Sequence, residues 1–128
     1  MLDSEQLRDR LEAILEALER VPRRFSKIQV PQDFIATEEG REHLDSISMV
    51  LLSVGEAFRQ IDDKTEGQYL SRYPEIPWRG VIGMRNVLAH DYFAVNEKII
   101  FNTCQLSVPP LMATVRQMLA DLLEARDL

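Results

Sequence analysis

Apolar residues recur every three or four positions in the N-terminal part of the chain, with polar or charged residues between them. The apolar positions are Leu7, Leu11, Ile14, Leu18 and Val21. This spacing places their side chains on one face of an α-helix. We expect the helix to begin after an N-cap at Ser4 and to end at Pro22, because proline lacks the N–H that a helix interior needs.

A second stretch repeats the same spacing over a longer distance. Its apolar positions are Leu44, Ile47, Leu51, Val54, Phe58 and Ile61. Met49, Val50 and Leu52 widen the apolar surface beyond one face, and such a helix usually needs a second partner surface. Gly55 interrupts this helix at a cost of about 1 kcal/mol relative to alanine, so we expect a neighbouring helix to approach closely there.

The segments that flank this stretch predict shorter elements. Residues 22–40 predict a connector with one helical turn, and residues 69–73 predict a short helix that Pro74 ends. The next helix should run from Trp78 to about Ala89, because the proline that precedes it suits the start of a helix.

The last predicted helix begins at Glu97, with Asn96 as its N-cap, and bends rather than ends at Pro109 and Pro110. No segment alternates apolar and polar residues as a half-buried strand does. The sequence therefore predicts an all-α fold, a bundle of four or five helices in a single domain that covers residues 1–128.

Composition limits the class of the protein and its location. A chain of 128 residues with 45% hydrophobic residues is typical of one folded domain. No apolar run approaches the ~20 residues that span a bilayer, and the acidic N-terminus does not look like a secretory signal. The single cysteine, Cys104, excludes an internal disulfide. We therefore expect a cytoplasmic protein without a membrane partner.

The formal net charge of −6 limits the kinds of nucleic-acid binding that fit the chain. A broad, non-specific nucleic-acid binder needs a basic surface that displaces counterions, so this charge argues against that class. An RNA-cutting site with a few arginines in one cleft remains compatible with it.

Candidate chemistry concentrates in residues 85–93, which contain Arg85, His90 and Tyr92. Histidine, with an unperturbed pKa of about 6.5, exchanges protons near neutral pH, and arginine binds phosphate oxygens as a bidentate fork. Together they suffice to cleave RNA without a metal: a ribose 2′-OH loses its proton and attacks the adjacent phosphorus, and the cation stabilises the phosphorane. Tyr92 could bind a phosphate oxygen or stack on a base.

The spacing of the two catalytic candidates sets a geometric condition. On one continuous helix the side chains of Arg85 and His90 would point about 140° apart. They converge better if His90 lies at the end of the helix or just beyond it, where the backbone can turn.

Structural roles compete with this interpretation. A lone histidine after a helix is often a C-terminal cap and a lone arginine a surface ion pair, and a short motif alone favours those roles. Elsewhere we expect His43 to be a solvated helix residue, Cys104 a buried thiol and Trp78 a packing anchor. The sequence shows no metal-ligand spacing and no Gly-rich phosphate loop, so we expect neither a metal nor a cofactor.

A longer run around this cluster resembles a known family. Residues 73–93 read YPEIPWRGVIGMRNVLAHDYF and closely resemble the HepT-like branch of the HEPN superfamily. Its R-x-x-x-x-H-x-Y motif is filled in register by Arg85, His90 and Tyr92. The upstream V-G-E-A segment, residues 54–57, is similar to the family's I-G-E-A, and P-P-L recurs downstream, so the resemblance spans about residues 33–115.

The resemblance implies a function. Such proteins are helical ribonuclease toxins that dimerise and bring two motifs into one cleft, and they are encoded beside a minimal nucleotidyltransferase antitoxin of the MntA type in type VII toxin–antitoxin systems. The antitoxin transfers adenylyl groups from ATP to the motif tyrosine, here Tyr92, and silences the toxin. By this resemblance Arg85 and His90 are catalytic, and Asn86 and Asp91 support the site.

One departure from the family keeps other hypotheses open. Many relatives carry an arginine at the position of Met49, which could have touched RNA. The first alternative is therefore a weak or inactive HEPN module that pairs with the nucleotidyltransferase. The second is a purely structural helical adaptor, in which Arg85, His90 and Tyr92 point away from one another into separate packing contacts.

Overall fold

The computed structural model describes residues 2–90 and 95–127, which form helices and turns and no strand. The α-helices are α1 (Ser4–Phe25), α2 (Asp33–Ala36), α3 (Glu38–Lys64), α4 (Trp78–His90), α5 (Glu97–Asn102) and α6 (Val108–Asp127). A 3-10 turn, Leu70–Arg72, precedes α4, and a π-helical turn, Thr103–Ser107, joins α5 to α6 without a break. If α5 to α6 is counted as one helix, the described residues form five, which confirms the predicted all-α class and helix number.

Helix α1 carries the predicted apolar stripe, but its two ends differ from the prediction. Asp3 is the N-cap: its carboxylate accepts a hydrogen bond from the N–H of Gln6, whose side chain accepts one from the N–H of Asp3 in return. Ser4 is instead the first helical residue, so the predicted cap was wrong by one position.

The prediction that Pro22 ends the first helix was also wrong, because α1 continues to Phe25. Packing explains why the last turn tolerates the proline. Val21 is buried, and the Phe25 ring lies against Phe34 and Phe101, with ring centroids 6.2 and 5.2 Å away. These contacts offset the loss of one helical hydrogen bond at Pro22.

Helix α3 begins earlier than expected, because Thr37 is its N-cap and accepts a hydrogen bond from the N–H of Gly40. The connector after α1 therefore ends before Gly40, and α2 supplies its one predicted helical turn. A Cβ on Gly40 would lie 2.1 Å from the carbonyl oxygen of Asp33. Only glycine fits this sharp corner between α2 and α3.

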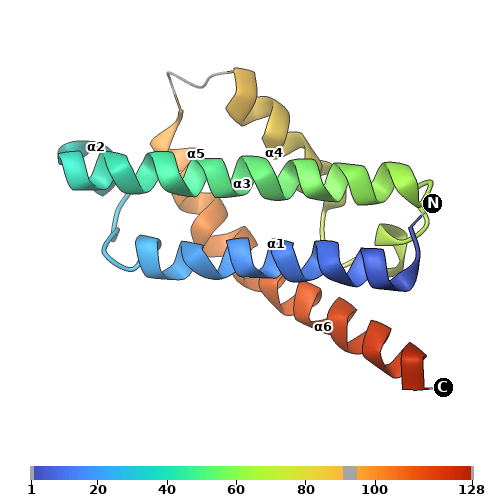
Figure 1. Ribbon diagram of the computed structural model, residues 1–128. Helices are drawn as coiled ribbons and strands as arrows, with labels where there is room; N and C mark the ends of the chain where they lie inside the picture. Colours follow the sequence, from blue (N-terminus) through green and yellow to red (C-terminus); the bar gives the residue numbers. More distant parts are fainter. Residues whose placement is uncertain (1, 91–94, 128) are drawn as a thin grey trace.

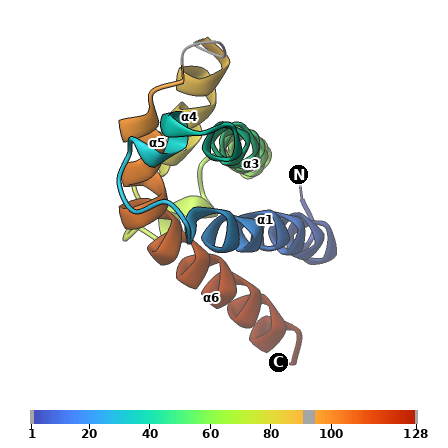
Figure 2. The ribbon, with the colours of Figure 1, turned by 90° about the vertical axis from the view of Figure 1, so that its left-hand side faces the viewer.

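The helices pack in an order that places α3 between α1 and α4. Figure 1 shows α1 and α3 side by side, with α4 rising from the opposite edge of α3, and Figure 2 shows the same order along the bundle. Helix α6 crosses α1 on its other side. The side chains with the least exposure come from α1, α2, α3, α5, α6 and the 3-10 turn: Leu11, Leu18, Val21, Phe34, Ile47, Phe58, Ile61, Leu70, Ile100, Val115 and Met118.

The final helical segment continues through Pro109 and Pro110, as predicted. The two prolines cannot donate helical hydrogen bonds, and the backbone just before them widens into the π turn, in which the N–H of Val108 reaches the carbonyl of Thr103. Cys104 lies in this turn and is buried, as expected, and burial raises the pKa of its thiol to about 12. None of the described helices combines the length and the apolar character needed to cross a bilayer.

Candidate active site

Helix α4 carries the Arg85 and His90 of the predicted motif, and packing at its first turn fixes it to the bundle. The indole N–H of Trp78 donates to the carbonyl of Tyr73 over 2.9 Å, and the Trp78 ring lies 4.8 Å from the ring of Phe58 on α3. The N–H of Val81 donates to the carbonyl of Pro77 over 3.1 Å. Trp78 is thus an anchor for the helix, as the sequence predicted.

Gly55 lets α3 and α4 approach closely, which confirms the reason predicted for a glycine in mid-helix. A Cβ on Gly55 would lie 3.0 Å from the carbonyl oxygen of Val81 and 3.4 Å from the Cβ of Arg85. A larger residue would therefore push α4 away from α3 at the turn that carries Arg85.

Arg85 faces α3 and pairs there with an acid that the sequence analysis did not single out. Its Nε forms an ion pair with Oε2 of Glu56, the residue next to Gly55. Glu56 is also held by Arg59, through contacts of 2.7 Å from Nη2 to Oε1 and 3.2 Å from Nε to Oε2. Arg59 in turn reaches Asp63 over 2.8 Å. The side chains of Arg85, Glu56, Arg59 and Asp63 therefore contact one another in sequence with alternating charge. We call these four residues the Arg85–Asp63 charge row.

The electrostatics of this row keep Glu56 ionised. The hydrogen bonding from Arg59, assisted by the hydrogen bond from Gln60 and by the charges of Arg59 and Arg85, lowers the pKa of Glu56 to about 2 despite partial desolvation. The hydrogen bond to Glu56 and its charge raise the pKa of Arg59. The side chains of Glu56 and Arg85 are 31% and 40% exposed, so the pair is open to solvent and to a ligand.

His90 is the last described residue of α4, so the described part of the helix extends one residue beyond the predicted Ala89. It is exposed, and no hydrogen bond or ion pair joins it to Arg85 in the described part of the chain. Both residues lie on one continuous helix, so their side chains leave it about 140° apart. Nη1 of Arg85 instead donates to Oδ1 of Asn86 over 3.3 Å. Asp91, predicted to support the site, and Tyr92, the predicted site of modification, lie outside the described residues.

The remaining candidates from the sequence occupy structural positions. His43, expected to be solvated, is instead partly buried on α3, with its side chain 25% exposed and Nε2 3.6 Å from a carboxylate oxygen of Glu39. Among residues 2–90 and 95–127, no three histidine, cysteine or acidic side chains gather closely enough to hold a metal ion.

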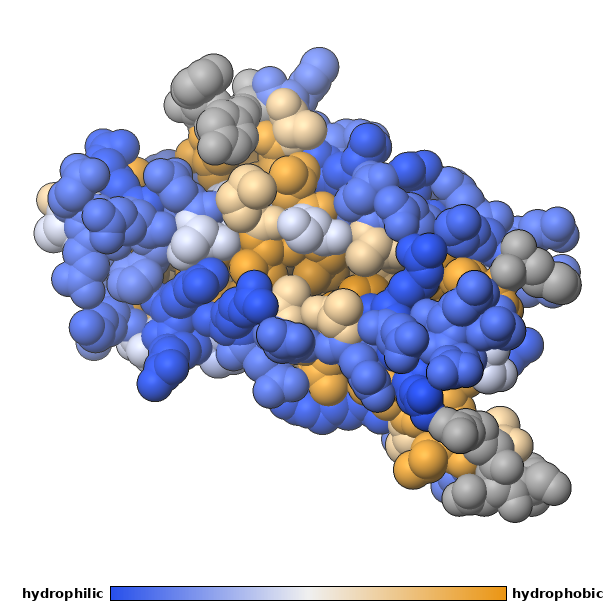
Figure 3. Space-filling view, in the orientation of Figure 1, coloured by the Kyte–Doolittle hydropathy of each residue, from blue (hydrophilic) through white to orange (hydrophobic). Residues whose placement is uncertain are grey.

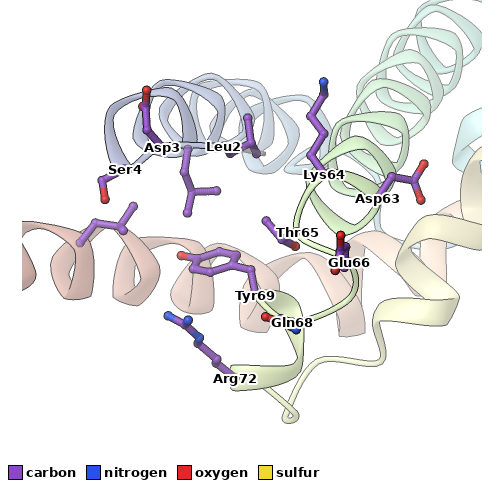
Figure 4. Close-up of a pocket in the computed structure, with 12 residues that line it drawn as sticks. Leu2, Asp3, Ser4, Asp63, Lys64, Thr65, Glu66, Gln68, Tyr69 and Arg72 are labelled. Atoms are coloured by element: carbon purple, nitrogen blue, oxygen red, sulfur yellow. The ribbon is translucent and has the colours of Figure 1, made fainter.

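The cavity drawn in Figure 4 lies away from the motif. It has a volume of about 470 Å³ and sits at the far end of α3, among Asp63 to Arg72, the start of α1 and Leu122. Arg72 lies over the Tyr69 ring there, 5.7 Å from its centroid. The site formed by Arg85 and Glu56 is therefore an open surface feature of α3 and α4 and not part of this cavity.

An apolar face borders the charge row. Figure 3 shows hydrophobic side chains gathered in the middle of this view, over the central part of α3 and its neighbours. Met49 on α3 is 48% exposed, and Leu52 is partly buried beside it. A shallow groove of about 210 Å³ lies between α1 and α3. It is lined by Arg10, Ala13, Ile14, Ala17, Ser53, Val54 and Ala57.

Several known proteins resemble this chain. One, from Thermococcus cleftensis, bears the name Probable ribonuclease HepT and is 30% identical over 81% of this chain and 87% of its own length. Two others, from Caldanaerobacter subterraneus and Methanocaldococcus jannaschii, are named as candidate RNases and are 32% and 28% identical over 52% and 54% of this chain. The matches span about half of the length of those two relatives.

No solved structure matches the fold closely enough to support an assignment. The family model described as Ribonuclease HepT-like matches residues 14–118, a range that includes α3, α4 and both catalytic candidates. Because that range is most of the chain, this protein belongs to the HepT-like ribonuclease family.

Proposed function

We propose that this protein is the toxin of a type VII toxin–antitoxin system, a metal-independent endoribonuclease in which Arg85 and His90 are the catalytic residues. One observation carries the proposal. In a chain of the HepT-like ribonuclease family, the motif arginine is partly exposed and held in place by Glu56, and the motif histidine stands at the exposed end of the same helix.

The two side chains account for the chemistry of RNA cleavage. The imidazole of His90 takes the proton of a ribose 2′-OH, and the 2′ oxygen attacks the adjacent phosphorus. The guanidinium of Arg85 stabilises the negative charge that builds on the phosphorane. The bond to the 5′ oxygen then breaks, that oxygen takes a proton, and the products carry a 2′,3′-cyclic phosphate and a 5′-OH.

A second copy of the chain completes the site in this proposal. Arg85 and His90 diverge by about 140° on one helix, so a shared cleft in a homodimer gives each arginine a histidine from the other chain. The exposed Met49 and the neighbouring Leu52 support this, because burying an apolar face favours association. The acidic net charge fits a toxin that makes few phosphate contacts at one local cleft.

Regulation is the third part of the proposal. A minimal nucleotidyltransferase of the MntA type would transfer AMP from ATP to the hydroxyl of Tyr92 and release pyrophosphate. The added phosphodiester is an anion, and it would compete with RNA for the cationic side chains of the same motif. Mass spectrometry of the protein co-expressed with such a partner tests this: a mass increase of one AMP on the Tyr92 peptide is expected, and an unmodified peptide contradicts it.

Cleavage of RNA in the presence of EDTA tests the catalytic proposal. The parent protein should cut RNA and leave 2′,3′-cyclic or 3′-phosphate ends, and His90→Ala should abolish cutting. The matched control is His43→Ala, which removes the other histidine of the chain and should cut at the parental rate. If the His90 variant cuts as fast as the parent, the mechanism is wrong.

A non-catalytic module is the second candidate, and Met49 favours it, because the position that is cationic in many relatives is here an exposed apolar residue. In that case the chain would bind the nucleotidyltransferase without cutting RNA. A tight complex with the partner, together with no cleavage and no growth arrest, would establish this function in place of the first.

A further inference from the structure

Glu56 touches the guanidinium of Arg85 from the neighbouring helix, and this contact suggests a role in the reaction. We propose that Glu56 is a positioning residue: its carboxylate holds Nε of Arg85, so that the Nη side of the guanidinium is presented to the RNA phosphate. The inference rests on the proposed ribonuclease function and adds a residue to it.

Two nitrogen atoms of the Arg85 guanidinium, Nε and Nη1, already have partners within the protein. Nε pairs with Oε2 of Glu56, and Nη1 donates to Oδ1 of Asn86 over 3.3 Å. An arginine has five N–H donors in a fixed plane, and two Nη donors match two oxygens of a phosphate. A carboxylate that engages Nε fixes the rotation of this plane and leaves Nη2 and the second N–H of Nη1 to donate to phosphate oxygens.

Glu56 is itself held in place, which a positioning residue requires. Oε1 accepts hydrogen bonds from Arg59 over 2.7 Å and from Gln60 over 3.4 Å, and Oε2 accepts one from Nε of Arg59 over 3.2 Å. Arg59 is anchored by Asp63 over 2.8 Å. The carboxylate is thus preorganised by residues of its own helix before RNA binds.

The backbone brings Glu56 to this contact through its neighbour Gly55. The close approach of α4 at Gly55, where a Cβ would lie 3.4 Å from the Cβ of Arg85, makes the gap between the helices short enough for the two side chains to meet. Gly55 therefore allows the close approach of α4, and Glu56 orients Arg85 on that helix.

Three roles for Glu56 predict different results when its charge is removed. A positioning residue, once lost, slows cleavage at saturating RNA while the fold and RNA binding change little. A purely structural bridge between α3 and α4 loses stability and cleavage together. A group that masks the charge of Arg85 gives tighter RNA binding and faster cleavage when it is removed.

The test compares Glu56→Gln and Glu56→Asp with the parent. The matched control is Glu16→Gln, which removes the same charge from an exposed pair with Arg20 on α1, 3.2 Å apart. Single-turnover cleavage, affinity for a 2′-deoxy analogue of the RNA, thermal unfolding and the NMR signal of the Arg85 Nε–H are measured on each full-length variant.

For Glu56→Gln we expect cleavage about 10- to 100-fold slower at saturating RNA, with affinity for the 2′-deoxy analogue changed less than about threefold. The Nε–H signal of Arg85 should shift, Glu56→Asp should recover part of the rate, and Glu16→Gln should match the parent.

Parental or faster cleavage by Glu56→Gln overturns the inference, as does a loss of rate that follows the unfolded fraction. If His90→Ala is slow while Glu56→Gln is not, only the positioning role fails. If His90→Ala also cuts at the parental rate, the proposed function fails and the positioning role fails with it.

Discussion

Helices α1 and α4 differ in how many of their side chains are buried. Helix α1 spans 22 residues and buries the predicted stripe of five, whereas α4 spans 13 and buries Leu88 alone. The first is held by a continuous buried apolar face, whereas the second packs extensively against α3 through side chains that are only partly buried, such as Trp78, Val81 and Met84. The comparison shows that the helix with the motif residues is packed on one side against α3 and keeps its other side exposed, whereas α1 contributes a fully buried face to the core.

The contacts that hold α4 are also those that shape the candidate site. The Phe58–Trp78 contact fixes the start of the helix, Gly55 sets its distance from α3, and the pair of Glu56 and Arg85 lies beside that glycine. A change at these positions should therefore affect activity before it unfolds the protein, whereas a change in α1 should do the reverse.

The largest expected effect is on stability, from Leu18→Ala on the fully buried face of α1. The cavity should lower the free energy of unfolding by about 2–5 kcal/mol, measured by urea denaturation. The control, Leu123→Ala, truncates a side chain that is 57% exposed and should change stability by less than about 0.5 kcal/mol. Cleavage per folded molecule should stay parental in both, and a specific loss of cleavage in Leu18→Ala would contradict the division between the two helices.

The next effect concerns the distance between α3 and α4. Gly55→Leu should cost about 1–3 kcal/mol, because its side chain would meet the Val81 carbonyl, and it should abolish cleavage by the molecules that remain folded. Gly83→Ala is the control: a Cβ there meets nothing within 4 Å, so removing a helical glycine should raise stability by up to about 1 kcal/mol. Full activity of Gly55→Leu would show that the close approach is not needed.

A smaller effect is expected on association through the apolar face. Met49→Asp should weaken dimerisation at least about tenfold, measured by sedimentation equilibrium, because it places a charge in the proposed interface. Leu106→Asp places the same charge on a more exposed leucine, 68% accessible, in the π turn and should leave association unchanged. An equal response of the two variants would contradict the proposed location of the interface.

The smallest effect is on the pH dependence of stability. The pKa of Glu56 lies near 2 in the folded chain against an ordinary value of 4.5, so the unfolded chain binds more protons between those values. The stabilising contribution of Glu56 is complete above about pH 4.5 and is lost as the pH falls toward 2. The Tm of the parent should therefore fall more steeply than that of Glu56→Gln over this range, and parallel curves would contradict the assigned ion pairs.

The sequence predicted the parts of the molecule that follow from local periodicity. The apolar stripes of α1 and α3, the start of α4 after Pro77, and the Asn96 cap of α5 all depend on neighbours in the chain, and the structure confirms them. The ends of α1 were predicted wrongly, since the choice of cap turns on a single position and tertiary contacts of Phe25 keep the turn after Pro22 helical.

The role of Glu56 was missed for a different reason. Its partner Arg85 comes from a separate helix, so the pair exists only after α3 and α4 have packed. The available signal was the adjacent Gly55, which the sequence did identify as a point of close approach, and the spacing of Glu56, Arg59 and Asp63 along one helix face. The convergence of Arg85 with His90 that the proposed function requires likewise cannot come from a single helix, on which the two side chains diverge.

The most direct test of the proposed function compares one RNA with the same RNA carrying a 2′-deoxy sugar at the cut position. Both are treated in EDTA with equal folded amounts of the parent and of Arg85→Ala. Only the RNA with the 2′-OH should be cut, and Arg85→Ala should cut it at least about 100-fold more slowly. Equal cleavage of the two substrates by the parent, or a parental rate for Arg85→Ala, would contradict catalysis by this motif.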